Sequence, residues 1–239
     1  MKTIKIAHLY YDLMNLYGEN GNIRVLANHL ENQNIKVITH YLSIDDEIDF
    51  EKYDIFYIGC GNKESFNLVL EDIKKYKKSI NSAIKNNKFF LVTGNALNLF
   101  GKTYLDLEKN TINTLGTFDF QSEEIKNRIV GEQEYKFHNL DKSIIGFQNR
   151  DTILTDVNEL HLFEVLKGTG YLPRSNFEGI TKNNFYGTYL LGPILARNPY
   201  FTEYLVKEIL RNKDLPYKVY QNEYETKAYE VYLKDVINN

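Results

Sequence analysis

The sequence predicts an α/β fold with a doubly wound, mostly parallel β-sheet and appended β-hairpins. Short apolar runs of strand length alternate with amphipathic helical segments in the N-terminal half, a pattern typical of buried parallel strands. After about residue 105 the chain changes to short extended pieces with turn residues. Its 239 residues, 43% of them hydrophobic, can bury a full core. We therefore expect one domain over residues 1–239, with C-terminal helices (about 199–239) packed on it.

The N-terminal half alternates strands and helices. Two segments repeat apolar residues at helical spacing, and each lies between predicted strands. This order implies right-handed crossovers and helices on both faces of the sheet. The predicted strands span 4–9, 36–42, 55–58 and 89–93, and the predicted helices 22–31 and 65–85.

The C-terminal half predicts hairpins followed by helices. Extended pieces at 114–120, 129–137 and 144–149 suggest hairpins appended to the main sheet. Asn198 and Pro199 form a typical helix start, with asparagine as the cap and proline at the first helical position. A tyrosine-rich helix over about 223–237 is expected to pack on the outside.

Composition argues against several classes of function. The net charge of −3 and a pI near 6.0 provide no basic field for nucleic acid. No apolar run approaches the roughly 20 residues of a membrane span, and the first residues lead straight into a strand, so we expect a cytoplasmic protein. Cys60 is the one cysteine, which excludes an internal disulfide and a cysteine-cluster metal site. No histidine pair has metal-ligand spacing, and we expect no cofactor.

Three loops are expected to form the functional site. Ligands of open parallel sheets bind at the carboxyl ends of the strands, so the loops after Leu9, Ile58 and Thr93 should converge. The third is built like the strand–turn–helix that exposes a nucleophile in α/β enzymes, yet it reads Thr93-Gly94-Asn95 and carries no cysteine. This absence decides whether the protein is an enzyme.

Four segments, in order along nearly the whole chain, have the form of family motifs: Asp12-Leu13-Met14-Asn15-Leu16-Tyr17-Gly18, Gly59-Cys60-Gly61-Asn62, Gly146-Phe147-Gln148-Asn149 and Gly187-Thr188-Tyr189-Leu190-Leu191-Gly192-Pro193. With them the chain resembles class I glutamine amidotransferases of the cobyric acid synthase (CobB/CobQ-like) type, and most of all the glutaminase subunits of lipid II isoglutaminyl synthases. The resemblance implies a flavodoxin-like sheet. It also implies a cysteine that attacks glutamine, a histidine base, and ammonia transfer in a heterodimer to a Mur-ligase-like ATP-dependent subunit that amidates the peptidoglycan stem peptide.

Carried over residue by residue, the resemblance fails at the reactive positions. The family's nucleophile cysteine corresponds to Gly94, and its catalytic histidine corresponds to Leu191. A further histidine that is usual in the family corresponds to Arg150, and the Gln-Asp of its glycine loop has become Asn62-Lys63. Glycine offers no nucleophile and leucine no proton acceptor, so the thiolate route to amide cleavage is closed.

The residues that correspond to the family's substrate-binding positions are better preserved than the catalytic ones. Arg128 corresponds to the family's glutamine-contacting arginine, and the resemblance makes Gly59, Gly61, Asn62 and Asn95 the other candidate substrate-binding residues. The preferred hypothesis is a catalytically degenerate subunit that partners a Mur-ligase-like enzyme and retains a pocket for glutamine or a related amino acid.

Two alternatives stay open. In the first, the chain is an active glutaminase with a relocated nucleophile, for which Cys60 is the candidate; its simpler interpretation is a small half-buried residue in the loop that supplies the family's oxyanion-hole backbone. In the second, it is a small-molecule-binding α/β domain without a ligase partner. Reactivity with a glutamine-analogue electrophile separates the first from degeneracy, and co-purification tests the second.

Other polar residues have simpler structural interpretations. Thr93 is a strand end suited to packing, and Asp12 suits a turn cap, although Asp12 and Glu19 are also candidates to bind a polar ligand or partner. His8 is a candidate to face the pocket, with a hydrogen-bonded core histidine as the simpler interpretation. The remaining histidines are expected to be structural or surface residues: His29, His40, His138 and His161.

Overall fold

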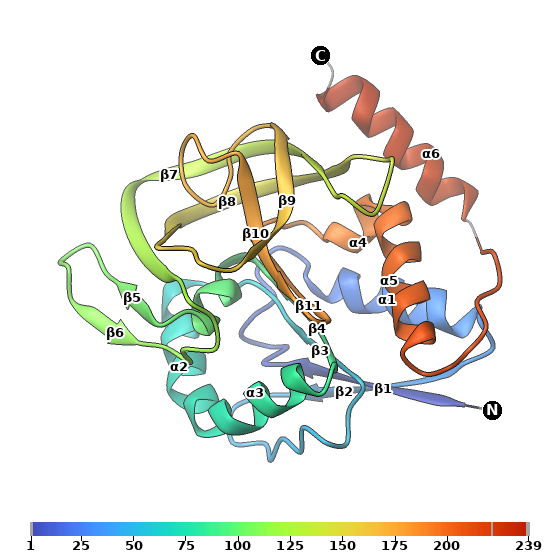
Figure 1. The fold of residues 1–239 in the computed structure, drawn as a ribbon, viewed down its shortest axis with the longest axis horizontal. Helices are drawn as coiled ribbons and strands as arrows, with labels where there is room; N and C mark the ends of the chain where they lie inside the picture. Colours follow the sequence, from blue (N-terminus) through green and yellow to red (C-terminus); the bar gives the residue numbers. More distant parts are fainter. Residues whose placement is uncertain (1, 221, 238–239) are drawn as a thin grey trace.

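A computed structural model describes residues 2–220 and 222–237. Five parallel strands form one end of its sheet, in the order β2-β1-β3-β4-β11 with β2 at the edge (Figure 1). The predicted strands are confirmed, three of them to the residue. The bounds are β1 (Thr3–Leu9), β2 (Lys36–Leu42), β3 (Ile55–Ile58), β4 (Phe89–Thr93) and β11 (Phe185–Thr188).

The sheet continues beyond β11 as a mainly antiparallel arm. Its order is β11-β10-β9-β7-β5-β6, with β8 paired to β7 and with β5 parallel to β7. Two of the predicted hairpin pieces, 129–137 and 144–149, lie largely in the paired strands β7 and β8. The bounds are β5 (Thr103–Leu105), β6 (Thr111–Asn113), β7 (Gln121–Lys136), β8 (Ile144–Thr155), β9 (Leu160–Lys167) and β10 (Phe177–Lys182).

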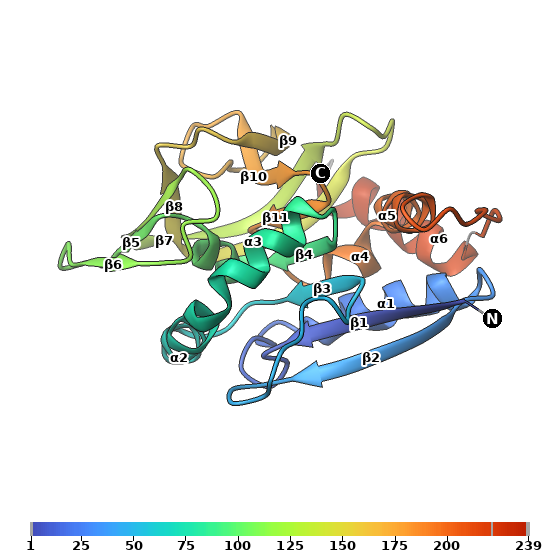
Figure 2. The ribbon, with the colours of Figure 1, turned by 60° about the horizontal axis from the view of Figure 1, so that its bottom comes forward.

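Helices cover both faces of the parallel strands, which confirms the doubly wound arrangement. In both ribbon views α2 (Lys63–Ile73) and α3 (Lys77–Lys85) lie on one side, while α1 (Asn20–Glu31) and α5 (Pro199–Arg211) lie on the other (Figures 1 and 2). Alternate residues of β4 supply the two cores: Phe90 and Val92 pack with α2 and α3, and Phe89 and Leu91 pack with α1 and α5. β4 is therefore buried on both faces.

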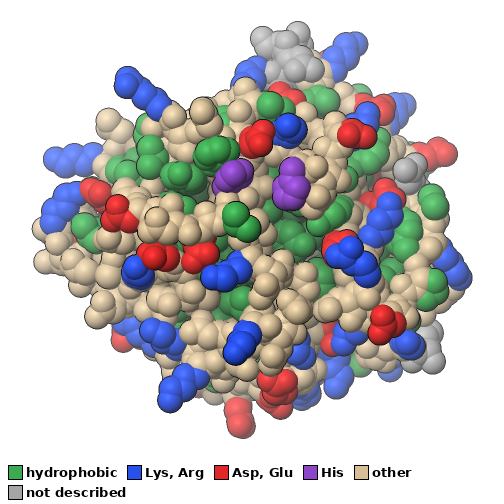
Figure 3. All heavy atoms as spheres, viewed as in Figure 1, with side chains coloured by type: hydrophobic (Ala, Val, Ile, Leu, Met, Phe, Trp, Pro, Cys, Tyr) green, Lys and Arg blue, Asp and Glu red, His purple; other side chains and the backbone are tan. Residues whose placement is uncertain are grey.

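Short elements complete the chain. A 3₁₀ helix (Gly94–Phe100) follows β4, α4 (Ile194–Arg197) precedes α5, and α6 (Glu223–Tyr232) continues into a π-helical turn (Leu233–Ile237). The expected terminal helix is thus present, and Tyr229 is its buried residue. No helix among the described residues is long and apolar enough to cross a bilayer. Lysine, arginine and acidic side chains are interspersed over the face shown in Figure 3.

Three local predictions are wrong. The segment predicted as one helix over 65–85 begins at Lys63 and is broken by a 3₁₀ turn (Lys74–Tyr76), where the Tyr76 hydroxyl donates to the Asp46 carbonyl at 2.7 Å. Residues 114–120 form no strand, because their amides bond the 3₁₀ segment, as Leu115 does with the Leu99 carbonyl at 2.9 Å. α5 starts as predicted, with Asn198 at the N-cap position and Pro199 in the first turn, but the predicted side-chain cap is absent, because the Asn198 side chain bonds both backbone groups of Ile145 in β8.

Candidate functional site

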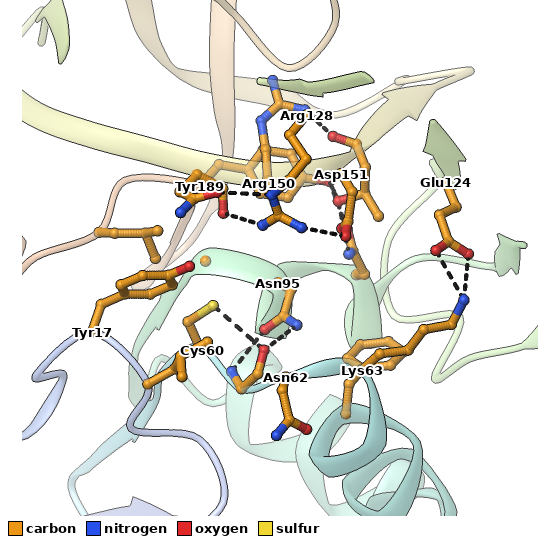
Figure 4. Close-up of a pocket in the computed structure, with 18 of the residues that line it drawn as sticks. Tyr17, Cys60, Asn62, Lys63, Asn95, Glu124, Arg128, Arg150, Asp151 and Tyr189 are labelled. Carbon is orange, nitrogen blue, oxygen red and sulfur yellow. Dashed lines mark hydrogen bonds and ion pairs between the residues drawn. The ribbon is translucent and has the colours of Figure 1, made fainter. Parts of the chain in front are cut away.

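A cavity of about 390 Å³ opens at the carboxyl ends of the parallel strands. The loops that follow β1, β3, β4 and β11 all reach it, so the predicted convergence of three loops is confirmed and a fourth joins them. The opposite wall comes from β7 and β8 (Figure 4). The residues used below line this cavity: Tyr17, Cys60, Gly61, Asn62, Lys63, Gly94, Asn95, Asn98, Glu124, Arg128, Asn149, Arg150, Asp151, Thr152, Tyr189 and Leu191.

Gly94 and Leu191, the two positions that the resemblance makes the catalytic ones, lie next to each other. Gly94 begins the 3₁₀ helix with φ +62°, a conformation that favours glycine. A Cβ added to Gly94 would lie 2.6 Å from Cβ of Cys60 and 2.7 Å from Cδ2 of Leu191. The backbone of Leu191 is held by its N–H, which donates to the Phe147 carbonyl at 2.9 Å. The space that a nucleophile at position 94 needs is therefore filled.

Cys60 lies beside this position as a buried thiol. Its Sγ is 2.9 Å from the Cβ that Gly94 lacks, and the side chain is 5% exposed. Burial raises the pKa of Cys60 to about 12, against a smaller lowering by the backbone N–H of Asn95. No histidine among the described residues lines the cavity, so the thiol has no imidazole base there. Cys60 is more buried than the half-buried residue that its sequence suggests.

Hydrogen bonds to Asn95, in the segment after β4, and to the first turn of α2 hold the loop after β3 in place. The Gly61 N–H donates to Oδ1 of Asn95 at 3.0 Å, and Nδ2 of Asn95 donates to the Gly61 carbonyl at 2.7 Å. Asn62 caps α2, because its Oδ1 accepts from the Ser65 N–H at 2.8 Å. A Cβ on Gly59 would meet the Met14 carbonyl at 2.6 Å, so this glycine lets two loops pack closely. The Gly61 amide is therefore occupied rather than free to stabilise an oxyanion.

The opposite wall carries charges. Arg128 sits on a bulge of β7, where residues 125–128 are inserted between the Glu124–Thr152 and Ile129–Arg150 pairs. Its guanidinium donates to Asp151 Oδ2 at 2.7 Å and to Asn149 Oδ1 at 2.9 Å. Lys63, at the start of α2, bonds both carboxylate oxygens of Glu124, at 2.8 and 2.9 Å. Two ion pairs thus border the cavity.

Arg150 lies deeper in the same wall and is 3% exposed. Its bonds go to neutral oxygens: Oε1 of Gln148 at 2.9 Å and the carbonyls of Gly170 at 2.6 Å, Tyr171 at 3.3 Å and Thr152. Its Cζ lies 4.2 Å from the ring centroid of Tyr189, a cation–π contact. Burial lowers the pKa of Arg150 without discharging the guanidinium.

Beneath the loops lies a buried network centred on Glu19. The hydroxyls of Tyr57 and Thr93 donate to its Oε2, and the Gly192 N–H also bonds the carboxyl. Glu19 is fully buried, and burial raises its pKa. It does not line the cavity, so the hypothesis that it meets a ligand directly is wrong, and Thr93 is a hydrogen-bonding residue rather than simple packing.

The remaining polar candidates lie away from the cavity. Asp12 accepts from the Ser43 hydroxyl at 2.7 and 2.8 Å. His8 is fully buried in the core, and neither ring nitrogen has a partner, contrary to the expected hydrogen-bonded histidine. Burial lowers the pKa of His8 to about 4. His29 contacts Glu225 at 2.8 Å and His40 contacts the Tyr53 hydroxyl at 2.9 Å, both in structural roles.

The other two histidines also have aromatic neighbours. His161 stacks on Phe177 with ring centroids 3.8 Å apart, and His138 meets the edge of Phe137 at 5.1 Å. Sequence reasoning missed Glu124 and Asp151 as site residues. Their carboxylates reach the cavity through the register of β7 with β8 and the bulge at residues 125–128, which the predicted hairpin pieces do not define.

Known proteins match this chain over nearly its whole length. It is 31% identical to the lipid II isoglutaminyl synthase (glutamine-hydrolyzing) subunit GatD of Streptococcus pneumoniae, over 98% of this chain and 88% of that protein. It is also 31% identical to the subunit of the same name in Staphylococcus aureus, over 97% of this chain and 95% of that protein. Identity at this level over this length reflects common descent.

A solved structure supports the fold. The glutaminase domain of Trypanosoma brucei CTP synthase, solved with bound acivicin, superposes with a TM-score of 0.51 at 10% identity, over 92% of this chain and 97% of that one. The sequence model of the CobB/CobQ-like glutamine amidotransferase domain matches residues 5–199. The chain therefore belongs to the CobB/CobQ-like glutamine amidotransferase family, as its motifs predict.

Proposed function

We propose that this chain is a non-hydrolysing amidotransferase subunit. It pairs with a Mur-ligase-like ATP-dependent subunit that amidates the peptidoglycan stem peptide, and it keeps its pocket for an amino acid. The names of the two relatives support the pathway, since both are subunits of lipid II isoglutaminyl synthases. The state of the reactive positions supports the loss of hydrolysis.

The closed space at Gly94 carries this proposal. Amide hydrolysis through a thioester needs a nucleophile, a base and donors for the oxyanion. Position 94 has no side chain, position 191 is leucine, and Asn95 occupies the Gly61 N–H. Cys60 and Leu191 pack against position 94, so the space that a catalytic side chain would need there is already occupied.

The charged wall supports retention of a ligand. Arg128 and Asp151 supply a cation and an anion at one border of the cavity, as the carboxylate and ammonium groups of an amino acid require. Asn95 and Asn62 line the cavity across from them (Figure 4). A cavity of about 390 Å³ has room for a free amino acid.

One observation favours an active glutaminase with Cys60 as its nucleophile. The Cys60 sulfur lies 2.9 Å from the Cβ position of the missing cysteine, and the Asn95 N–H is directed at it. The pKa of about 12 opposes this alternative, because the thiolate is then a minute fraction at neutral pH.

A glutamine-analogue electrophile tests the chemistry. The purified chain is incubated with the electrophile, alone and with a Mur-ligase-like subunit of its own organism, and its intact mass is measured. We expect no adduct in either condition, with an active relative as the positive control. An adduct that disappears in Cys60→Ala would overturn the proposal in favour of the relocated nucleophile.

Association is tested separately. The tagged chain, expressed in its own organism, should co-purify with a Mur-ligase-like protein at a fixed ratio. Recovery of the chain by itself under conditions that retain an intact relative's complex would instead favour a ligand-binding domain without a ligase partner.

A further inference from the structure

The charges that line the cavity do not balance. Among the described lining residues, Lys63, Arg128 and Arg150 are cationic, whereas Glu124 and Asp151 are anionic. Lys63 is paired with Glu124 and Arg128 with Asp151, each within 3 Å. The third cation, Arg150, has no carboxylate among its hydrogen-bond partners. One net positive charge is therefore left in the wall.

The buried environment of Arg150 increases the electrostatic effect of this charge on the cavity. The guanidinium is removed from solvent, so water screens it far less than it screens the exposed pairs at the rim. Carbonyl oxygens and the Tyr189 ring fix its position but do not neutralise it. A buried cation held in this way attracts a negative ligand group into the adjoining cavity.

A buried carboxyl close to Arg150 compensates part of the charge. Glu178 accepts from the Tyr189 N–H and the Thr188 hydroxyl, each at 2.7 Å, and does not line the cavity. Burial raises the pKa of Glu178 to about 7, so it carries only part of a negative charge at neutral pH. The cavity itself stays electropositive.

We infer that Arg150 turns this pocket into a site for an acidic amino acid, a dicarboxylate such as L-glutamate, in preference to the neutral amide L-glutamine. The inference rests on the proposed function, since a hydrolysing site would have to accept glutamine. The ligand's α-amino and α-carboxylate groups have the Asp151–Arg128 pair available, and its second carboxylate supplies the anion that Arg150 lacks. Glutamine offers no such charge, although its shape is nearly the same.

Calorimetric titration of the purified chain with L-glutamate and L-glutamine tests the inference. We expect glutamate to bind about tenfold more tightly than glutamine, the difference that one buried charge interaction provides. Arg150→Gln should reduce this ratio to near one, while Arg150→Lys, which keeps the charge, should keep part of the preference. Equal affinities in the unmodified chain, or a preference unchanged in a folded Arg150→Gln variant, would overturn the inference.

Arg197 offers a matched control. Its Cζ also lies over a tyrosine, 4.9 Å from the Tyr232 ring, but it is outside the cavity. Arg197→Gln should leave the glutamate preference unchanged, and a comparable loss in this variant would contradict a specific role of Arg150. If Arg150→Gln does not fold, the affinity ratio of the unmodified chain decides the inference.

The same titration keeps the two proposals distinguishable. Conversion of glutamine to glutamate during the experiment would refute the proposed function. Unconverted glutamine that binds as tightly as glutamate would refute only the role of Arg150.

Discussion

The two walls of the cavity differ in what their side chains are used for. On the loop wall, Gly61, Asn62 and Asn95 bond one another or the backbone, and Cys60 packs against Gly94. On the strand wall, which β7 and β8 form, the cationic side chains of Arg128 and Arg150 line the cavity. Under the proposed function, the loop wall is the reactive half of an amidotransferase site that has become packed structure, and the strand wall is the half that keeps its ligand contacts.

The largest expected change in stability comes from placing a cysteine at position 94. Gly94→Cys places a side chain at positive φ and against Cys60 and Leu191, which should lower the free energy of unfolding by about 4 kcal/mol. Denaturant unfolding measures the loss. Cys60→Gly should relieve part of it in the double variant, and simple additivity of the two effects would show that the two positions do not press on each other.

Restoring both catalytic residues should not restore the enzyme. Gly94→Cys with Leu191→His still lacks the glycine-loop Gln-Asp, replaced by Asn62 and Lys63, and Asn95 still occupies the Gly61 N–H. Steady-state glutaminase assays should give turnover far below that of an intact relative. Turnover equal to the relative's would mean that the loop wall is less closed than its hydrogen bonds indicate.

The buried Glu19 carboxyl accepts hydrogen bonds from Tyr57 and Thr93 beneath the loops of the loop wall. Glu19→Ala leaves the buried Tyr57 and Thr93 hydroxyls without their acceptor and should cost about 3 kcal/mol of stability. Glu19→Gln, which keeps an oxygen acceptor, should cost clearly less. Thermal and denaturant melts compare the two variants, and equal losses would count against the hydrogen-bond explanation.

Glu178, a buried carboxyl in β10 that does not line the cavity, makes the stability of the fold depend on pH. Its folded pKa of about 7 lies above the ordinary value of 4.5, so the folded state binds a proton that the unfolded state has lost between these values. Stability from this group is complete below pH 4.5 and falls as pH rises to 7, by at most about 1.4 kcal/mol per unit.

The comparison with Glu178→Gln isolates this slope. His8, whose pKa is lowered to about 4, acts in the opposite direction, because its stability contribution grows as pH rises from 4 to 6.5. Unfolding curves of the unmodified chain and Glu178→Gln share this His8 contribution. Their stability difference should shrink toward pH 7, and a constant difference would rule out titration of Glu178.

The smallest effect on stability is expected at the rim of the strand wall. Arg128→Gln breaks a half-exposed pair with Asp151 and should change the free energy of unfolding by less than about 1 kcal/mol. The same substitution should weaken amino-acid binding by about tenfold or more, because the ligand loses its carboxylate partner. Calorimetry checks the binding, and undiminished affinity would remove Arg128 from the ligand site.

Local patterns predicted the parallel half of the fold and failed where distant strands meet. Residues 55–58 and 89–93 are strands as predicted, because uninterrupted apolar runs indicate burial on both faces. The bulge that brings Arg128 to Asp151 depends on the register between β7 and β8, which no local pattern encodes. Likewise, nothing near Glu19 in the sequence announces that Tyr57 and Thr93 will bury it.

Glutamate release from glutamine is the most direct measurement of the central claim. The unmodified chain and Cys60→Ala are assayed alone and with the Mur-ligase-like subunit, beside an active relative. Loss of hydrolysis predicts no release above background in any of these samples except the relative. Release by the unmodified chain that Cys60→Ala abolishes would contradict it and would make Cys60 the nucleophile of a working glutaminase.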